Sequence, residues 1–255
     1  VNAPEFPADL EWLNVSKPLQ MKQLRGKIVV LDFWTYCCIN CLHVLGDLAR
    51  LEQKYPNELV VIGVHSAKFS AEKETQNIRQ AVMRYGIEHP VVNDAEHQIW
   101  SEYAVRAWPS FMLIDPMGKI IGSHSGEQVF ELFDRVIGEM VEHYRAEGQL
   151  NLQPLEEIVL ESNSEPQPLL SFPGKVLADD AGKRLFIADS GHNRIVVVGL
   201  ESGRVMSIIG SGEPGLVDGD YAEAQLRNPQ GMAVEGDFLF VADTDNHALR
   251  RVDLR

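Results

Sequence analysis

Three cysteines, the only ones in the 255-residue chain, lie within five positions of one another. They are Cys37, Cys38 and Cys41, and the last two form a C-x-x-C pair. At this spacing one thiolate can attack a disulfide, and the second thiol can then resolve the mixed disulfide. An apolar stretch at 28–33 precedes the cysteines, and leucines at helical spacing follow them. The sequence therefore predicts a strand, a turn that carries the thiols, and a helix.

Cys38 is expected at the N-terminus of that helix, where unpaired backbone N–H groups and the helix dipole favour a negative charge. We therefore expect Cys38 to be the attacking sulfur. Cys41 lies one turn further on and is expected to be more buried and to act as the resolving thiol. Inert core thiols and a zinc site are the alternatives. Zinc needs about four ligands, and the sequence has no second cysteine pair.

The stretch from 30 to 41 resembles the thioredoxin superfamily, in which a strand runs into Phe-Trp-x-x-Trp-Cys-x-x-Cys. Cys37 stands where the family usually has its second Trp, and Ile-Asn replaces the usual Gly-Pro between the paired cysteines. The resemblance implies that Asp32 is the buried acid beneath Cys41 and takes its proton; a carboxylate that caps a turn is the alternative. Cys37 is interpreted as a packing residue or as an accessory redox thiol.

A second motif, Trp108 to Asp115, resembles the superfamily's pattern of a small residue, Pro, Thr or Ser, an apolar run and Asp. The resemblance implies that Pro109 follows a cis peptide bond and faces the C-x-x-C. It also implies that the backbone of Trp108 pairs with an extended segment of the bound disulfide partner. The two motifs predict an α/β thioredoxin-like domain of the TlpA/ResA type over residues 1–150.

The elements that would position these motifs alternate along the chain. The apolar run at 59–65 suits a central parallel strand that is covered on both faces. Further elements are a short helical turn at 9–14, a helix at 70–86, a strand at 87–92, and helices at 94–103 and 126–145. This order predicts right-handed strand–helix–strand crossovers.

Residues 151–168 are rich in proline and polar residues and are predicted to be a linker. An internal repeat follows in 169–255, where Asp189 and Asp243 occupy equivalent places 54 residues apart. Three or four short strands per repeat indicate propeller blades, and the Ala-Asp-Ser/Thr turn resembles NHL repeats. The Asp side chains are expected to be structural. About two blades of the roughly 4 to 8 that a propeller needs imply an incomplete all-β propeller, completed by further sequence or by another copy.

The net charge of −14 argues against nucleic acid and against an anionic membrane surface as partners. No apolar run approaches the ~20 residues that span a bilayer. Clustered cysteines give no disulfide framework, which fits a reducing compartment and predicts a cytoplasmic location. The chain does not begin with Met, so removal of an upstream segment stays open. We expect neither a cofactor nor a metal.

These features predict a thiol–disulfide oxidoreductase whose partners are protein disulfides or dithiols. One alternative is a binding module, in which the propeller docks a protein and the redox fold is vestigial. Another is a thiol peroxidase, because Thr35 and Arg106 lie near the two motifs, although Leu31 occupies the place of a proline that peroxiredoxins carry. The order of the two domains and the Cys-Cys-Ile-Asn-Cys site resemble the NHL-repeat-containing protein 2 family.

Overall fold

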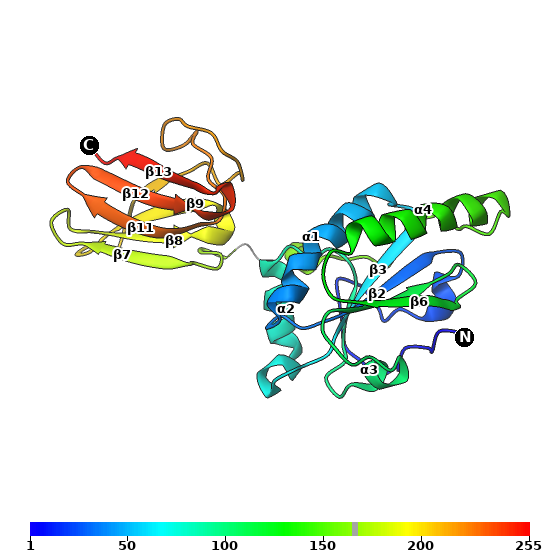
Figure 1. The fold of residues 1–255 in the computed structure, drawn as a ribbon. Helices are drawn as coiled ribbons and strands as arrows, with labels where there is room; N and C mark the ends of the chain where they lie inside the picture. The colour runs from blue at the N-terminus through cyan, green and yellow to red at the C-terminus, as the bar shows by residue number, and fades with distance from the viewer. Residues whose placement is uncertain (165–167) are drawn as a thin grey trace. The chain divides into compact units, whose positions relative to one another are not determined.

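The computed structural model describes residues 1–164 and 168–255 of the chain (Figure 1). It divides into two compact units, Val1–Pro166 and Gln167–Arg255. Residues 165–167 of the predicted linker lie outside the described residues. Each unit has its own hydrophobic core, and each is described here by itself.

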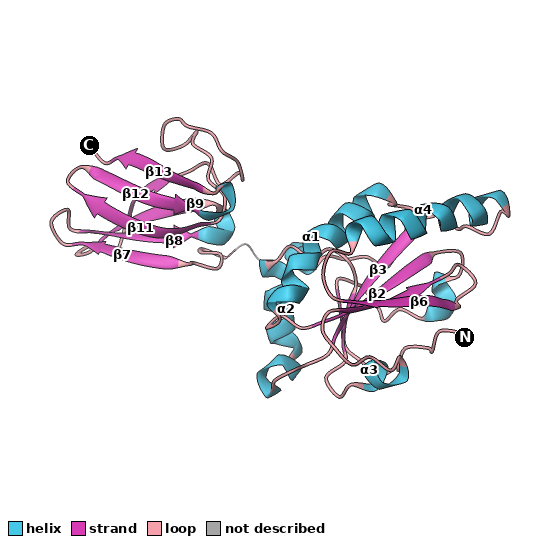
Figure 2. Ribbon diagram, in the orientation of Figure 1, coloured by secondary structure: helices cyan, strands magenta, loops and turns pink. Residues whose placement is uncertain are grey.

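The first unit is built on a six-stranded sheet in the order β1-β4-β3-β2-β5-β6 (Figure 2). The strands β2, β3 and β4 are parallel, whereas β5 and β6 form an antiparallel edge. Every residue of β2 and β3 is buried, as a doubly covered parallel strand requires. The strand bounds are Trp12–Leu13 (β1), Ile28–Trp34 (β2), Leu59–His65 (β3), Val91–Asn93 (β4), Ser110–Ile114 (β5) and Ile120–Ser125 (β6).

Alternate residues of each strand point to opposite faces of the sheet, so apolar side chains on both faces need to be covered by other elements. On one face, α1 and α4 pack side by side over the central strands (Figure 1). The helix predicted at 126–145 corresponds to α4, which buries Phe133, Ile137, Met140 and Val141. The helix bounds are Ile39–Lys54 (α1), Thr75–Arg84 (α2), Gln98–Glu102 (α3), Phe130–Ala146 (α4) and Glu161–Ser164 (α5), with single 3₁₀ turns at Met21–Leu24 and Ser70–Lys73.

Several expected elements differ in the structure. The helix expected at 70–86 is a 3₁₀ turn followed by α2, and Glu74 between them has extended backbone angles. The helical turn expected at 9–14 is wrong, because Trp12 and Leu13 pair with β4 as a short strand. The strand expected at 87–92 begins only at Val91.

Residues 151–164, which the sequence places in a linker, run along the first unit. Ile158 forms an isolated β-bridge with Val15, and the Glu161 carboxylate lies 2.6 Å from Nε of Arg79 on α2. The Nζ atom of Lys27 donates to the backbone oxygen of Gln153 at 2.6 Å. These contacts hold the segment against the sheet domain.

The second unit consists of two antiparallel sheets, one of four strands in the order β10-β9-β8-β7 and one of three in the order β11-β12-β13. Their inner faces share a core that includes Phe186, Val197, Leu239 and Val241. Paired sheets of three or four strands agree with the predicted repeat, while their assignment to an incomplete NHL propeller stays a prediction. The bounds are Lys175–Asp179 (β7), Arg184–Asp189 (β8), Arg194–Gly199 (β9), Val205–Ile209 (β10), Pro229–Glu235 (β11), Phe238–Asp243 (β12) and Ala248–Asp253 (β13).

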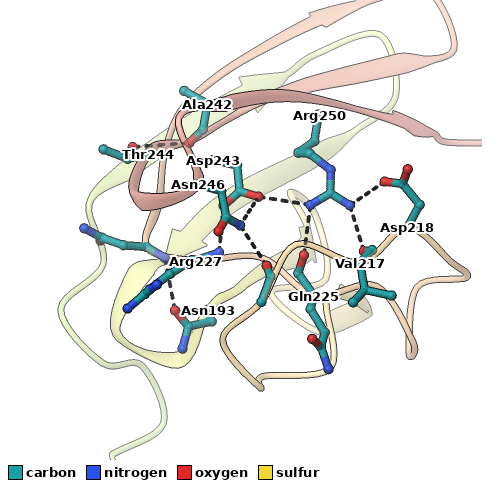
Figure 3. A network of polar contacts seen from close by, with 12 residues as sticks. Asn193, Val217, Asp218, Gln225, Arg227, Ala242, Asp243, Thr244, Asn246 and Arg250 are labelled. Atoms are coloured by element: carbon teal, nitrogen blue, oxygen red, sulfur yellow. Dashed lines mark hydrogen bonds and ion pairs between the residues drawn. The ribbon is translucent and has the colours of Figure 1, made fainter.

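The repeat is visible in the hydrogen bonds of two buried aspartates. Asp243 at the end of β12 accepts bonds from the backbone N–H of Arg227, from Asn246 and from Arg250, at 2.6, 2.8 and 3.0 Å (Figure 3). Asp189 at the end of β8 accepts from Ser171 N–H and from Arg194 Nε, at 2.6 and 2.8 Å, and its Oδ2 lies 2.9 Å from His192 Nδ1. The contacts of both aspartates fit the structural role predicted for them.

Candidate active site

The junction of β2 and α1 brings two of the three thiols together. Cys38 is the N-cap residue of α1 and is partly exposed, whereas Cys41 lies within the first turn and is fully buried. The backbone N–H of Cys41 donates to the backbone oxygen of Cys38 at 3.0 Å, and Cys38 packs against the buried cluster that contains Cys41. Burial raises the pKa of Cys41 well above its usual range, and the contact with Cys38 and the charge of Asp32 act in the same direction. The attacking position is therefore accessible and the second thiol is held protonated.

Asp32 lies on β2 and is fully buried, and neither of its carboxylate oxygens has a hydrogen-bond partner among the described residues. Burial raises the pKa of Asp32 to about 7, and the nearby charge of His89 lowers it against that effect. A carboxyl group with this pKa exchanges protons readily at neutral pH. The charge of Asp32 raises the pKa of Cys41, so these two predicted residues interact electrostatically.

Cys37 is exposed, yet its environment disfavours the thiolate. The neighbouring carboxylate of Glu72 raises the pKa of Cys37 to about 11, and burial acts in the same direction. Glu72 is itself buried and accepts bonds from the backbone N–H groups of Lys68 and Phe69 at 2.5 and 3.1 Å. Burial alone would raise the pKa of Glu72, but its contacts with Cys37, Thr35 and Lys68 lower it.

The turn before the cysteines is supported from β3. His65 is buried, its ring stacks on Tyr36 at 5.4 Å between centroids, and its Nε2 lies 3.4 Å from the Tyr36 backbone N. Burial lowers the pKa of His65 to about 4, so the ring is neutral and accepts that N–H. His65 is thus a buried residue that packs against the turn before the cysteines.

The second motif lies where the sequence predicts it, at the start of β5. The Trp108–Pro109 peptide bond is cis, which confirms that prediction. Trp108 and Cys38 both border the buried cluster that contains Trp34 and Cys41. The indole N–H of Trp108 donates to the backbone oxygen of Ser66 at 3.1 Å, which fixes the ring beside the thiol turn.

Sequence reasoning missed two titratable residues behind Cys41. His89 lies just before β4 and is 6% exposed, and its Nδ1 lies 3.3 Å from a carboxylate oxygen of Glu52 on α1. Burial would lower the pKa of His89, but the charge and hydrogen bond of Glu52, together with the charge of Asp32, raise it. The only sequence signal is that Glu52 falls on the side of α1 turned toward the sheet.

The described residues that suggested a peroxidase or a metal site do not come together to form one. Thr35 is completely buried beside Glu72, and Arg106 is exposed. In the described ranges 1–164 and 168–255, no three His, Cys, Asp or Glu residues gather into a metal-binding group. No helix within those ranges has the length and apolar character needed to cross a membrane.

A family model described as thioredoxin-like matches residues 26–120, which include both motifs. The chain is also similar over 51% of its length to the thiol–disulfide oxidoreductase ResA of Bacillus anthracis, with 32% identity over 130 residues that cover 70% of that protein. These two similarities concern the first unit.

Two larger proteins match nearly the whole chain. The human NHL repeat-containing protein 2 is 44% identical over 257 residues, which cover 100% of this chain and 35% of that protein. The chloroplastic protein SUPPRESSOR OF QUENCHING 1 of Arabidopsis thaliana is 47% identical over 257 residues, which cover 98% of this chain and 24% of that protein. The chain thus spans about a third or less of the length of these relatives.

Proposed function

Because the chain belongs to the thioredoxin-like family, we propose that its first unit is a thiol–disulfide oxidoreductase that acts on protein disulfides. The observation that carries the proposal is the contact between an accessible Cys38 at a helix N-terminus and a buried, protonated Cys41 above Asp32. Cys38 attacks the substrate disulfide, and Cys41 then displaces the substrate from Cys38. Asp32 accepts the Cys41 proton in that second step.

Cys37 takes no part in this exchange. Its thiol is exposed but is held protonated by Glu72, and the thiolate is the reactive form. Trp108 and the cis-bonded Pro109 would position the extended substrate segment beside Cys38. A protein partner bound by the second unit is part of the proposal. A cytoplasmic location stays a prediction, since one matching relative is chloroplastic.

Two assays with insulin test the proposal: mixed-disulfide trapping with pre-reduced protein in the absence of free thiol, and insulin reduction with dithiothreitol as the terminal reductant. The Cys41→Ser variant should accumulate a covalent complex through Cys38, because its resolving thiol is missing. The Cys38→Ser variant should form none and should lose insulin reduction. Cys37→Ser is the matched control and should retain it. Insulin reduction at the wild-type rate by Cys38→Ser would contradict the proposal.

A further inference from the structure

Three buried polar groups without a partner surround Gly63 on β3. Gly63 is the register partner of Asp32 on β2, so the two residues are adjacent across parallel strands. A Cβ atom at Gly63 would lie 2.9 Å from Nε1 of Trp34 and 3.4 Å from Nε2 of His89. Neither of these nitrogens, nor either carboxylate oxygen of Asp32, has a hydrogen-bond partner among the described residues. The missing side chain thus leaves Nε2 of His89 beside the position on β3 that pairs with Asp32.

The opposite edge of the His89 ring leads toward solvent. Its Nδ1 lies 3.3 Å from Glu52 Oε2, and the Glu52 side chain is 29% exposed. Both residues line a cavity of about 730 Å³ between α1, β3 and the segment 154–160. Asp32 does not line this cavity. A polar path therefore leads from the buried acid, through one imidazole ring, to a carboxylate that contacts solvent.

We infer that His89 and Glu52 are positioning residues that carry the Cys41 proton from Asp32 to solvent. This inference rests on the proposed oxidoreductase function and adds a route for the proton that Asp32 receives. An imidazole suits the task because one ring nitrogen accepts a proton while the other releases one. Proton transfer across the space at Gly63 occurs directly or through one water molecule.

The Cys41 thiol gives its proton to Asp32, and the resulting thiolate attacks Cys38 Sγ in the mixed disulfide. The Cys38–Cys41 bond forms, the bond between Cys38 and the substrate sulfur breaks, and the substrate leaves as a thiolate that takes a proton from solvent. The protein dithiol is oxidised and the substrate disulfide is reduced. Asp32 then passes its proton to Nε2 of His89, and Nδ1 releases a proton to Glu52.

The charged groups around His89 favour a proton on its ring. Asp32 faces the ring from β2 and Glu52 faces it from α1, so a carboxylate lies on each side of the imidazole. Lys27 and Glu88 line the same cavity, and Lys27 Nζ is engaged by the backbone oxygens of Asn57 and Gln153 at 2.6 Å each. Because His89 lowers the pKa of Asp32, removal of the imidazole should shift that pKa upward.

The test is the pH profile of insulin reduction by the full chain, measured from pH 5.5 to 9 for wild type and His89→Ala. The variant should lose about tenfold in rate at pH 7, and its inflection should move to higher pH. Added imidazole should restore much of the rate, because the cavity beside His89 is open to small molecules. His143→Ala is the matched control, since His143 forms an exposed pair with Glu147 on α4, 3.5 Å apart.

Glu52→Gln is a second variant and should change the packing little. It tests the proton relay if His89→Ala does not fold. It should shift the inflection in the same direction, because loss of its charge makes His89 a weaker base. An unchanged pH profile in both variants would overturn the relay while leaving the oxidoreductase in place. A slow His89→Ala that imidazole does not rescue would also overturn it. A wild-type protein that does not reduce insulin would overturn both proposals.

Discussion

The two units bury aspartates in opposite ways. Asp32 in the first unit and Asp243 in the second are both 0% exposed. Asp243 accepts three hydrogen bonds, one of them from the guanidinium group of Arg250. Asp32 accepts none from the described residues, and burial raises its pKa to about 7. A buried carboxylate with all its bonds satisfied stabilises a turn, whereas an unsatisfied one gains or loses a proton under mild conditions.

The two aspartates also differ in the roles that we assign to them. In the second unit the acid, the arginine and the backbone N–H groups form a closed network that specifies the turn between two strands (Figure 3). In the first unit the charge of the acid acts on Cys41, and in the proposed mechanism its cost to stability accompanies a proton-transfer role. Stability and activity should therefore respond separately to changes at the two aspartates.

The largest effect on stability is expected from Asp243→Ala. The change removes the buried acceptor of Arg250, whose side chain is 11% exposed, and leaves the N–H of Arg227 without its acceptor. The local free energy of opening of β12 and β13 should fall by about 3 kcal/mol. Hydrogen exchange of peptides from these strands measures it. The exposed neighbour Asp245→Ala should change it by less than about 0.5 kcal/mol, and equal effects would contradict the structural role.

The stability of the first unit should depend on pH through Asp32. Its pKa is about 7 in the folded chain and about 3.9 in an unfolded one. Between these values the folded state holds a proton that the unfolded state has lost, so stability falls as the pH rises, by up to roughly 1.4 kcal/mol per pH unit. Asp32→Asn removes this contribution.

Tryptophan fluorescence measures the effect selectively, because all four tryptophans lie in the first unit. Urea unfolding of wild type and Asp32→Asn should give a stability difference that increases in favour of the variant from pH 4 to pH 7 and then levels off. A difference that stays constant over this range would show that Asp32 is not a buried acid of raised pKa.

Asp32→Asn should also slow disulfide exchange while leaving the second unit unchanged. Without the carboxylate, Cys41 must lose its proton to solvent, and the rate of insulin reduction at pH 7 should fall roughly a hundredfold. The deficit should shrink at alkaline pH, where hydroxide removes the proton. Asp245→Ala serves as the remote control. A variant with the wild-type rate at pH 7 would remove Asp32 from the mechanism.

The smallest effect is expected at Cys37. In a Cys38→Ser/Cys41→Ser background this is the only thiol, and Glu72→Gln should lower its pKa from about 11 because the carboxylate charge is lost. A decrease of one unit raises the thiolate fraction at pH 8 about tenfold. The rate of alkylation by iodoacetamide should rise accordingly. Glu74→Gln, an exposed neighbour, should leave it unchanged, and an equal rise in both variants would contradict the role of Glu72.

Much of the site was predictable because its signals are local. The C-x-x-C pair, the apolar strand before it and the leucine spacing after it lie in one short stretch, which is enough to place Cys38 at the N-terminus of α1. The cis bond before Pro109 followed from a second short motif. The parallel strand at 59–65 was evident from its continuous apolar run.

The rest depends on contacts between distant segments. His89 and Glu52 are separated by 37 positions and meet only because α1 and the loop before β4 cover the same face of the sheet. Glu72 faces Cys37 because the expected helix at 70–86 is interrupted at Glu74. The segment 151–164 is polar and rich in proline, yet its bridge at Ile158 and its ion pair at Glu161 attach it to the first unit.

A redox titration of the wild-type chain against glutathione, with mass mapping of the cysteines at each point, tests the central proposal most directly. The account predicts one reversible two-electron couple in which Cys38 and Cys41 form the disulfide, while Cys37 remains a free thiol throughout. Absence of a reversible couple, or a disulfide that involves Cys37, would contradict it.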